Sequence, residues 1–121
     1  MARAILVHMS GATKTGFAGA TLIALGRMAA MGKLPRNPFA GIRIPSTMRS
    51  DEAWSAGHRA AASALTAAGV GPVAIAVIVG ASRPRPETQR TVLRIANMWL
   101  VGWIGIAVLQ ARQAARTATP G

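Results

Sequence analysis

The chain has 121 residues, which is enough for one domain. Hydrophobic residues make up 51% of it and charged residues only 14%, whereas a typical soluble domain has about 25% charged residues. The net charge is +11 and there are no cysteines, so disulfides, thiolate chemistry and cysteine-based zinc sites are excluded.

The strong positive charge is also typical of nucleic-acid-binding proteins. Here, however, the basic residues lie at the edges of apolar segments, where arginines and lysines of membrane proteins meet anionic lipid headgroups. We therefore expect an integral membrane protein with lipid partners and no nucleic acid. Extraction by high salt alone would favour the nucleic-acid alternative, because phosphate contacts weaken steeply with salt.

Three apolar stretches have about the 20 residues that cross the hydrocarbon of a bilayer. They cover residues 12–31, 60–81 and 91–110. The sequence therefore predicts an all-α fold, an integral membrane three-helix bundle that forms a single domain over residues 1–121. Residues 112–121 are expected to be a fraying polar tail.

Small residues recur every four positions in the first two apolar stretches, which predicts strips for close helix packing. The strips consist of Ala12, Gly16, Ala20 and Ala24 in the first stretch, and of Ala60, Ala64, Ala68, Pro72, Ala76 and Gly80 in the second. In the third stretch, Trp99 and Trp103 lie too deep for an interfacial aromatic belt. We expect them to face another helix or another subunit of a homo-oligomer.

Residues 32–59 are predicted to be a motif loop, with a short interfacial loop or helix, between the first two spans. Three prolines within it disfavour helix. Ser50 is expected to be an N-cap, with Asp51 and Glu52 in the first turn against the helix dipole. A helix is therefore predicted to begin at Asp51 and to continue into the second span.

The distribution of basic residues predicts the orientation of the chain. With the N-terminus outside, eight lysines and arginines lie on the inner side and six on the outer side. Because basic residues are enriched in cytoplasmic loops, we expect a multi-pass protein of the cell membrane. Its N-terminus would be outside, and its C-terminus and motif loop cytoplasmic.

The motif loop also carries a distinctive set of residues: Asn37, Gly41-Ile42-Arg43, Pro45, Ser46-Thr47, Trp54 and His58-Arg59. This pattern resembles the signature of the SdpI-like family of small multi-pass membrane proteins. The chain departs from the family pattern at Ile44, where a threonine or a similar small residue is usual. The family is named after an immunity protein that protects its producer from a secreted peptide toxin.

The resemblance implies non-covalent binding of a peptide or protein partner at the membrane, in immunity, in signalling or as an accessory subunit. The implied site consists of Asn37, Gly41, Arg43, Pro45, Thr47, Trp54, His58 and Arg59. In this reading the loop folds back onto the helix bundle, where Asn37 caps a turn and Arg43 bonds backbone carbonyls or nearby acids. In the alternative reading the loop only anchors at the headgroups, with its arginines on lipid phosphates.

Enzymatic sites are not expected. Ser50, Asp51, Ser55 and His58 provide the residue types of a hydrolase triad, but nothing in the sequence resembles a nucleophile elbow. Two histidines and three carboxylates are too few for a dedicated metal site. We therefore expect no catalytic residue, no metal and no cofactor.

A small transporter or channel subunit is the alternative function. Ionisable groups within a membrane are functional candidates by default. Lys14, Arg94 and Asn97, together with His8, would form its intramembrane polar site. Three short spans would form such a pathway only as an oligomer.

Overall fold

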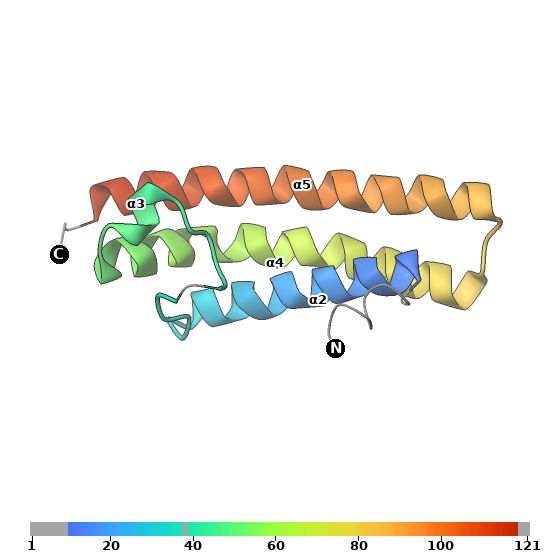
Figure 1. Ribbon diagram of the computed structural model, residues 1–121, viewed down its shortest axis with the longest axis horizontal. Helices are drawn as coiled ribbons and strands as arrows, with labels where there is room; N and C mark the ends of the chain where they lie inside the picture. Colours follow the sequence, from blue (N-terminus) through green and yellow to red (C-terminus); the bar gives the residue numbers. More distant parts are fainter. Residues whose placement is uncertain (1–9, 38, 119–121) are drawn as a thin grey trace.

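The computed structural model describes residues 10–37 and 39–118, and all regular secondary structure in these residues is helical. The helices are α2 (Gly11–Ala30), α3 (Pro45–Met48), α4 (Asp51–Ser82) and α5 (Pro86–Thr117). The three long helices lie side by side, with α4 between α2 and α5 and each antiparallel to the next (Figure 1). The all-α prediction is confirmed.

The two ends of the bundle differ in structure. One end holds α3, its flanking loops and the C-terminal end of α5, while the other holds the short connection between α4 and α5 (Figure 1). We call the first the motif end, meaning residues 32–59 together with residues 111–118. The arrangement places the C-terminal part of α5 beside the motif, as the predicted topology requires.

Helices α4 and α5 are longer than the predicted spans, with 32 residues each. At 1.5 Å per residue, each is about 48 Å long, whereas the hydrocarbon of a bilayer is about 30 Å thick. Within the described residues these two helices are long and apolar enough to cross a membrane. Helix α2, whose 20 residues include Lys14 and Arg27, does not belong to that set.

The helix predicted to begin at Asp51 is confirmed. The Ser50 hydroxyl accepts a hydrogen bond from the Ala53 N–H at 3.0 Å, and Asp51 and Glu52 occupy the first turn. The helix continues through Pro72 to Ser82.

The predicted packing strip of α2 is correct at Ala12, which is buried, and at Gly16, which lies close to Ala76 of α4, and it is wrong at its other two positions. The buried residues of α2 are Ala12, Gly19, Gly26 and Ala29, while Ala20 and Ala24 are exposed. A repeat of four residues drifts around a helix of 3.6 residues per turn, whereas a repeat of seven stays nearly on one face. In α4 the strip is correct over 64–72, but Ala60 and Gly80 at its ends are exposed.

Glycines bring the backbones of α2 and α4 into contact. A Cβ atom built on Gly19 would lie 2.6 Å from the Gly69 carbonyl oxygen, and one built on Gly69 would overlap the Gly19 carbonyl oxygen. Gly26 approaches α4 in the same way, beside Thr66. These positions hold the two helices together by close backbone approach.

The two tryptophans of α5 face α4, as one of the two predicted arrangements requires. Trp99 Nε1 donates to the Ala67 carbonyl oxygen at 2.8 Å, and the indole lies against Gly71. Trp103 is half-buried and packs on a core cluster that includes Ile42 and Leu65.

The prediction that residues 112–121 are a fraying tail is wrong for the described part. Helix α5 continues to Thr117, and Ala111 and Ala115 are fully buried. Arg49 from the motif loop donates to the Ala115 carbonyl at 2.6 Å and to the Ala118 carbonyl at 2.9 Å. The Ala115 carbonyl also accepts from the Ala118 N–H at 3.3 Å. Arg49 thus adds a cation at the carboxyl end of α5, where the helix dipole favours positive charge.

We expect Arg49→Ala to destabilise the last turn of α5. Hydrogen bonds from a charged group contribute about 1.5–3 kcal/mol, so amide hydrogen exchange at Ala115 and Ala118 should become faster. Gln113→Ala, an exposed change in the same turn, is the control. Equal exchange rates in the two variants would contradict the cap.

Candidate functional site

His58 is the centre of the motif end, because both of its ring nitrogens bind backbone. The Ile42 N–H donates to Nε2 at 2.8 Å, and Nδ1 lies 2.8 Å from the Trp54 carbonyl oxygen. A carbonyl only accepts, so Nδ1 carries the proton and Nε2 is the acceptor. The side chain is 2% exposed. His58 is therefore a neutral residue that joins the loop to α4.

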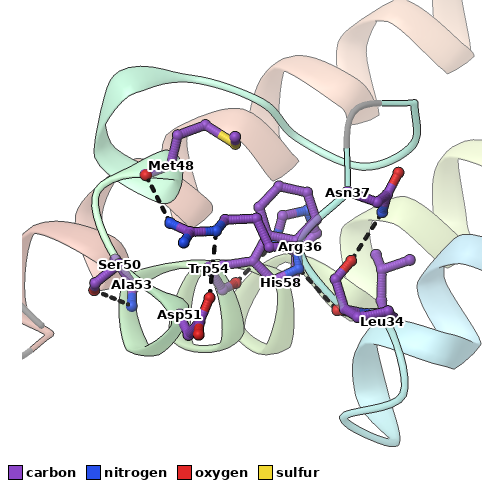
Figure 2. A network of polar contacts seen from close by, with 10 residues as sticks. Leu34, Arg36, Asn37, Met48, Ser50, Asp51, Ala53, Trp54 and His58 are labelled. Atoms are coloured by element: carbon purple, nitrogen blue, oxygen red, sulfur yellow. Dashed lines mark hydrogen bonds and ion pairs between the residues drawn. The ribbon is translucent and has the colours of Figure 1, made fainter.

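Trp54 provides the second attachment of the loop. Its Nε1 donates to the Leu34 carbonyl at 2.8 Å, and its ring stacks on His58 with centroids 4.0 Å apart (Figure 2). The indole is 1% exposed. The two stacked rings, four residues apart on α4, thus bind the loop at Leu34 and at Ile42.

Gly41 passes directly over these two rings. Its φ is +107°, and a Cβ atom there would lie 2.7 Å from His58 Nε2 and 3.0 Å from the Trp54 ring. Only glycine combines this backbone conformation with such a close approach.

Asn37 closes a turn before Gly41. Its Oδ1 accepts from the Phe39 and Ala40 N–H groups at 2.9 and 2.8 Å, and its Nδ2 donates to the Pro35 carbonyl at 2.8 Å. This is the turn-capping role expected for an asparagine.

Thr47 and Pro45 define the turn of α3. The Thr47 hydroxyl donates to the Ile42 carbonyl at 2.6 Å and accepts from the Ile44 N–H at 3.2 Å. Pro45 occupies the first helical position, where its missing N–H costs nothing. The side chain of Thr47 is fully buried, so α3 is held against the loop from inside.

Arg36 makes contacts of the kind that the sequence predicted for Arg43. Its Nη1 donates to the Met48 carbonyl at 3.0 Å and its Nε lies 3.3 Å from Asp51 Oδ1 (Figure 2). Arg43 and Arg59 are both exposed. No signal in the sequence distinguishes Arg36 from Arg43, because both are basic residues of the same loop.

A hollow of about 730 Å³ opens beside this network. It is lined by Gly32, Lys33, Leu34, Pro35, Arg36, Asp51, Trp54 and Ser55. The motif residues thus do two different things. One group fixes the loop and consists of Asn37, Gly41, Thr47, Trp54 and His58. The other group lines the open hollow and includes Arg36 and Asp51, with the buried Trp54 beneath them.

The predicted intramembrane polar site is assembled only in part. Lys14 and Asn97 line a second hollow of about 340 Å³ between α2 and α5. Arg94 is exposed and does not belong to its lining. His8 lies outside the described residues.

Two of the residues considered for a hydrolase triad make structural hydrogen bonds instead. Ser50 accepts from the Ala53 N–H, and both nitrogens of His58 bind backbone groups. Within residues 10–37 and 39–118, no three histidine or carboxylate side chains come together as metal ligands.

His58 should make the stability of the motif end depend on pH. The predicted span covers residues 60–81, so the polar start of α4, residues 51–59, precedes it. Burial lowers the pKa of His58 below its ordinary value of 6.5, against a smaller opposing effect of the Trp54 carbonyl. A lowered pKa means that the unfolded chain binds the proton more readily, so stability is full above pH 6.5 and falls as the pH drops below it.

The measurement is chemical unfolding in detergent between pH 5 and pH 8. Protonation of Nε2 would leave the buried Ile42 N–H without an acceptor, which costs about 1–3 kcal/mol. His58→Gln should flatten the pH profile, while His8→Asn should keep it. A wild-type profile that is flat or that rises toward acid would contradict the neutral histidine.

The sequence of the motif end and of the two long apolar helices matches a known protein family. The model of the SdpI/YfhL protein family matches residues 33–111, which include the motif loop, α3, all of α4 and most of α5. No curated protein and no solved structure was found to match the chain. Because the match covers well over half of the chain, including every residue of the predicted motif, the chain belongs to the SdpI/YfhL protein family.

Proposed function

We propose that this chain spans the cell membrane with α2, α4 and α5 and binds a peptide or protein partner, without covalent chemistry, at the motif end. The observation that carries the proposal is the hollow of about 730 Å³ beside the motif loop. Its volume lies within the range of about 300–1,000 Å³ that is usual for binding sites.

Membrane crossing is supported by the surface of the bundle. Two helices are long and apolar enough to cross, and large apolar side chains are exposed along α5, including Ile95, Met98 and Val101. Such side chains favour lipid over water by about 25 cal/mol for each Å² of apolar surface. Helix α2 packs along α4 through glycine contacts and would be the third span.

The hollow is suited to a peptide because it offers both charges and an apolar edge. Lys33 contributes a cation, the Arg36–Asp51 pair contributes both signs, and the exposed Pro35 contributes apolar carbon. The loop that forms the hollow is fixed by buried hydrogen bonds, so little entropy would be lost when a partner binds. A peptide toxin, a regulator or a subunit of a larger membrane complex would each fit this chemistry.

Single-cysteine cross-linking tests this proposal, because the native chain has no cysteine. A photoreactive group on Ser55→Cys, an exposed position of the hollow, should cross-link a partner in native membranes. The same group on Ser82→Cys, exposed at the opposite end, should not. Trp54→Ala should abolish the Ser55 product, and identical products from both positions would overturn the proposal.

The immunity version has its own test. Cells that lack the gene should become more sensitive to a membrane-active peptide, and a Trp54→Ala copy should fail to restore resistance. Unchanged sensitivity to every peptide tried would remove this version and leave the other partners.

A transporter subunit is the second candidate, supported by the hollow that Lys14 and Asn97 line. Liposomes containing the chain should then show a solute flux that Asn97→Leu reduces. The absence of flux in the wild-type chain would eliminate this candidate.

A further inference from the structure

A second groove lies at the motif end, between α3 and the end of α5. Its volume is about 370 Å³, and it is lined by Ile44, Pro45, Ser46, Val108, Arg112 and Arg116. None of these residues lines the hollow proposed for the partner. The groove is therefore a separate feature of the molecule.

The groove combines an apolar floor with two cations. Arg112 and Arg116 are four residues apart, so they share one face of α5, and both are exposed. Of the three acids in the chain, Asp51 binds Arg36, and neither Asp51 nor Glu52 lines the groove. Glu87 lies at the opposite end of α5.

Arg49 leaves these two arginines available for a ligand. Guanidinium groups near the end of a helix commonly bind its last carbonyls. Here Arg49 already donates to the carbonyls of Ala115 and Ala118. An anion that enters the groove would thus meet two guanidinium groups.

The position of the groove along α5 indicates what kind of anion it takes. Val108 belongs to the predicted span over residues 91–110, whereas Arg112 and Arg116 lie about one and two turns beyond Val108. The groove therefore runs from the hydrocarbon to the headgroup level. Its second wall is α3, which the buried Thr47 holds in place.

We propose that this groove is a binding site for one anionic phospholipid. The lipid phosphate pairs with Arg112 and Arg116, and the start of an acyl chain lies on Val108 and Ile44. This inference rests on the membrane placement in the proposed function but not on partner binding. It differs from general attraction to headgroups, because two helices and a fixed loop build the site.

The test is native mass spectrometry of the whole protein in neutral detergent. The protein is titrated with phosphatidylglycerol or with a phosphatidylcholine that has the same acyl chains. We expect saturable binding of one phosphatidylglycerol and much weaker binding of phosphatidylcholine. The R112Q/R116Q variant should bind phosphatidylglycerol roughly 30-fold more weakly, from about fivefold for each arginine near a lipid surface. The R85Q/R90Q variant loses the same charge at the opposite end and should bind as the wild type does.

The R112K/R116K variant guards against misfolding, because it should retain most of the affinity and the same helical circular dichroism. Equal losses in R112Q/R116Q and R85Q/R90Q would overturn the site in favour of general electrostatics. Displacement of the lipid by an equal concentration of inorganic phosphate, or a preference for an acidic peptide, would also overturn it. Any of these outcomes leaves the Ser55 cross-linking result unaffected, so the two proposals fail separately.

Discussion

Gly41→Ala should lower the free energy of unfolding by about 3 kcal/mol. The backbone there has a φ of +107°, which is strained for alanine and costs about 1–3 kcal/mol. The new methyl group would also lie 2.7 Å from His58 Nε2, within the space where the Ile42 N–H bonds. Overpacking of this kind typically costs a further amount of about 1–3 kcal/mol.

Gly32→Ala is the matched control, because Gly32 also has a positive φ, of +67°. A Cβ atom at this position would lie 3.5 Å from its nearest neighbour, Arg59 Nη2, which is an ordinary van der Waals contact. The control should cost only about 1–2 kcal/mol. Both are measured by denaturant unfolding in detergent, followed by circular dichroism. Equal losses in the two variants would show that the approach of Gly41 to the rings is unimportant.

Gly69→Ala should destabilise the contact between α2 and α4 by about 2 kcal/mol or more. Alanine in a helix is normally more favourable than glycine by up to about 1 kcal/mol. At this position the methyl group would overlap the Gly19 carbonyl oxygen and press on Ile23. Because both obstacles include backbone, the two helices would have to separate, with a cost of the size seen for overpacking.

Gly80→Ala tests the sign of this effect in the same helix. Gly80 has no atom within 4 Å of a built Cβ, so the substitution should be neutral or stabilising. The stabilities of the Gly69→Ala and Gly80→Ala variants are compared by unfolding in a denaturing detergent, with the helix content as the measured signal. A stabilising effect at both positions would contradict the close packing of α2 on α4.

The helical architecture was predictable from local patterns. Ser50 followed by Asp51 and Glu52 marked the start of α4, and the prolines at 35 and 45 marked a segment that is not helical until α3. The role of Asn37 followed from its short side chain, which accepts from the Phe39 and Ala40 N–H groups. These features depend on neighbours in the sequence and on backbone rules alone.

The contacts between distant segments were not predictable in the same way. Arg49 caps the end of α5 across more than sixty residues, so the sequence around residue 115 gave no sign that the helix would continue. Arg36 and Arg43 are both basic loop residues, and only the path of the chain puts Arg36 beside Asp51. The face on which α2 packs depended on the helical period, which a repeat of four residues misrepresents.

The motif itself was found, but its physical role differs from a simple contact surface. Gly41, Thr47, Trp54 and His58 make internal bonds and close contacts that shape the loop. Their substitution would therefore change the hollow indirectly, through the loop. Exposed positions such as Ser55 separate partner contact from loop structure more cleanly.

The membrane placement of the motif end is tested most directly by labelling single cysteines with a membrane-impermeant maleimide on sealed vesicles. Ser55→Cys lies at the motif end, Ser82→Cys at the opposite end, and Ala74→Cys on an exposed face between them. We predict that Ser55→Cys reacts from one side only, Ser82→Cys only from the other, and Ala74→Cys from neither. Labelling of all three from the same side without detergent would contradict the account.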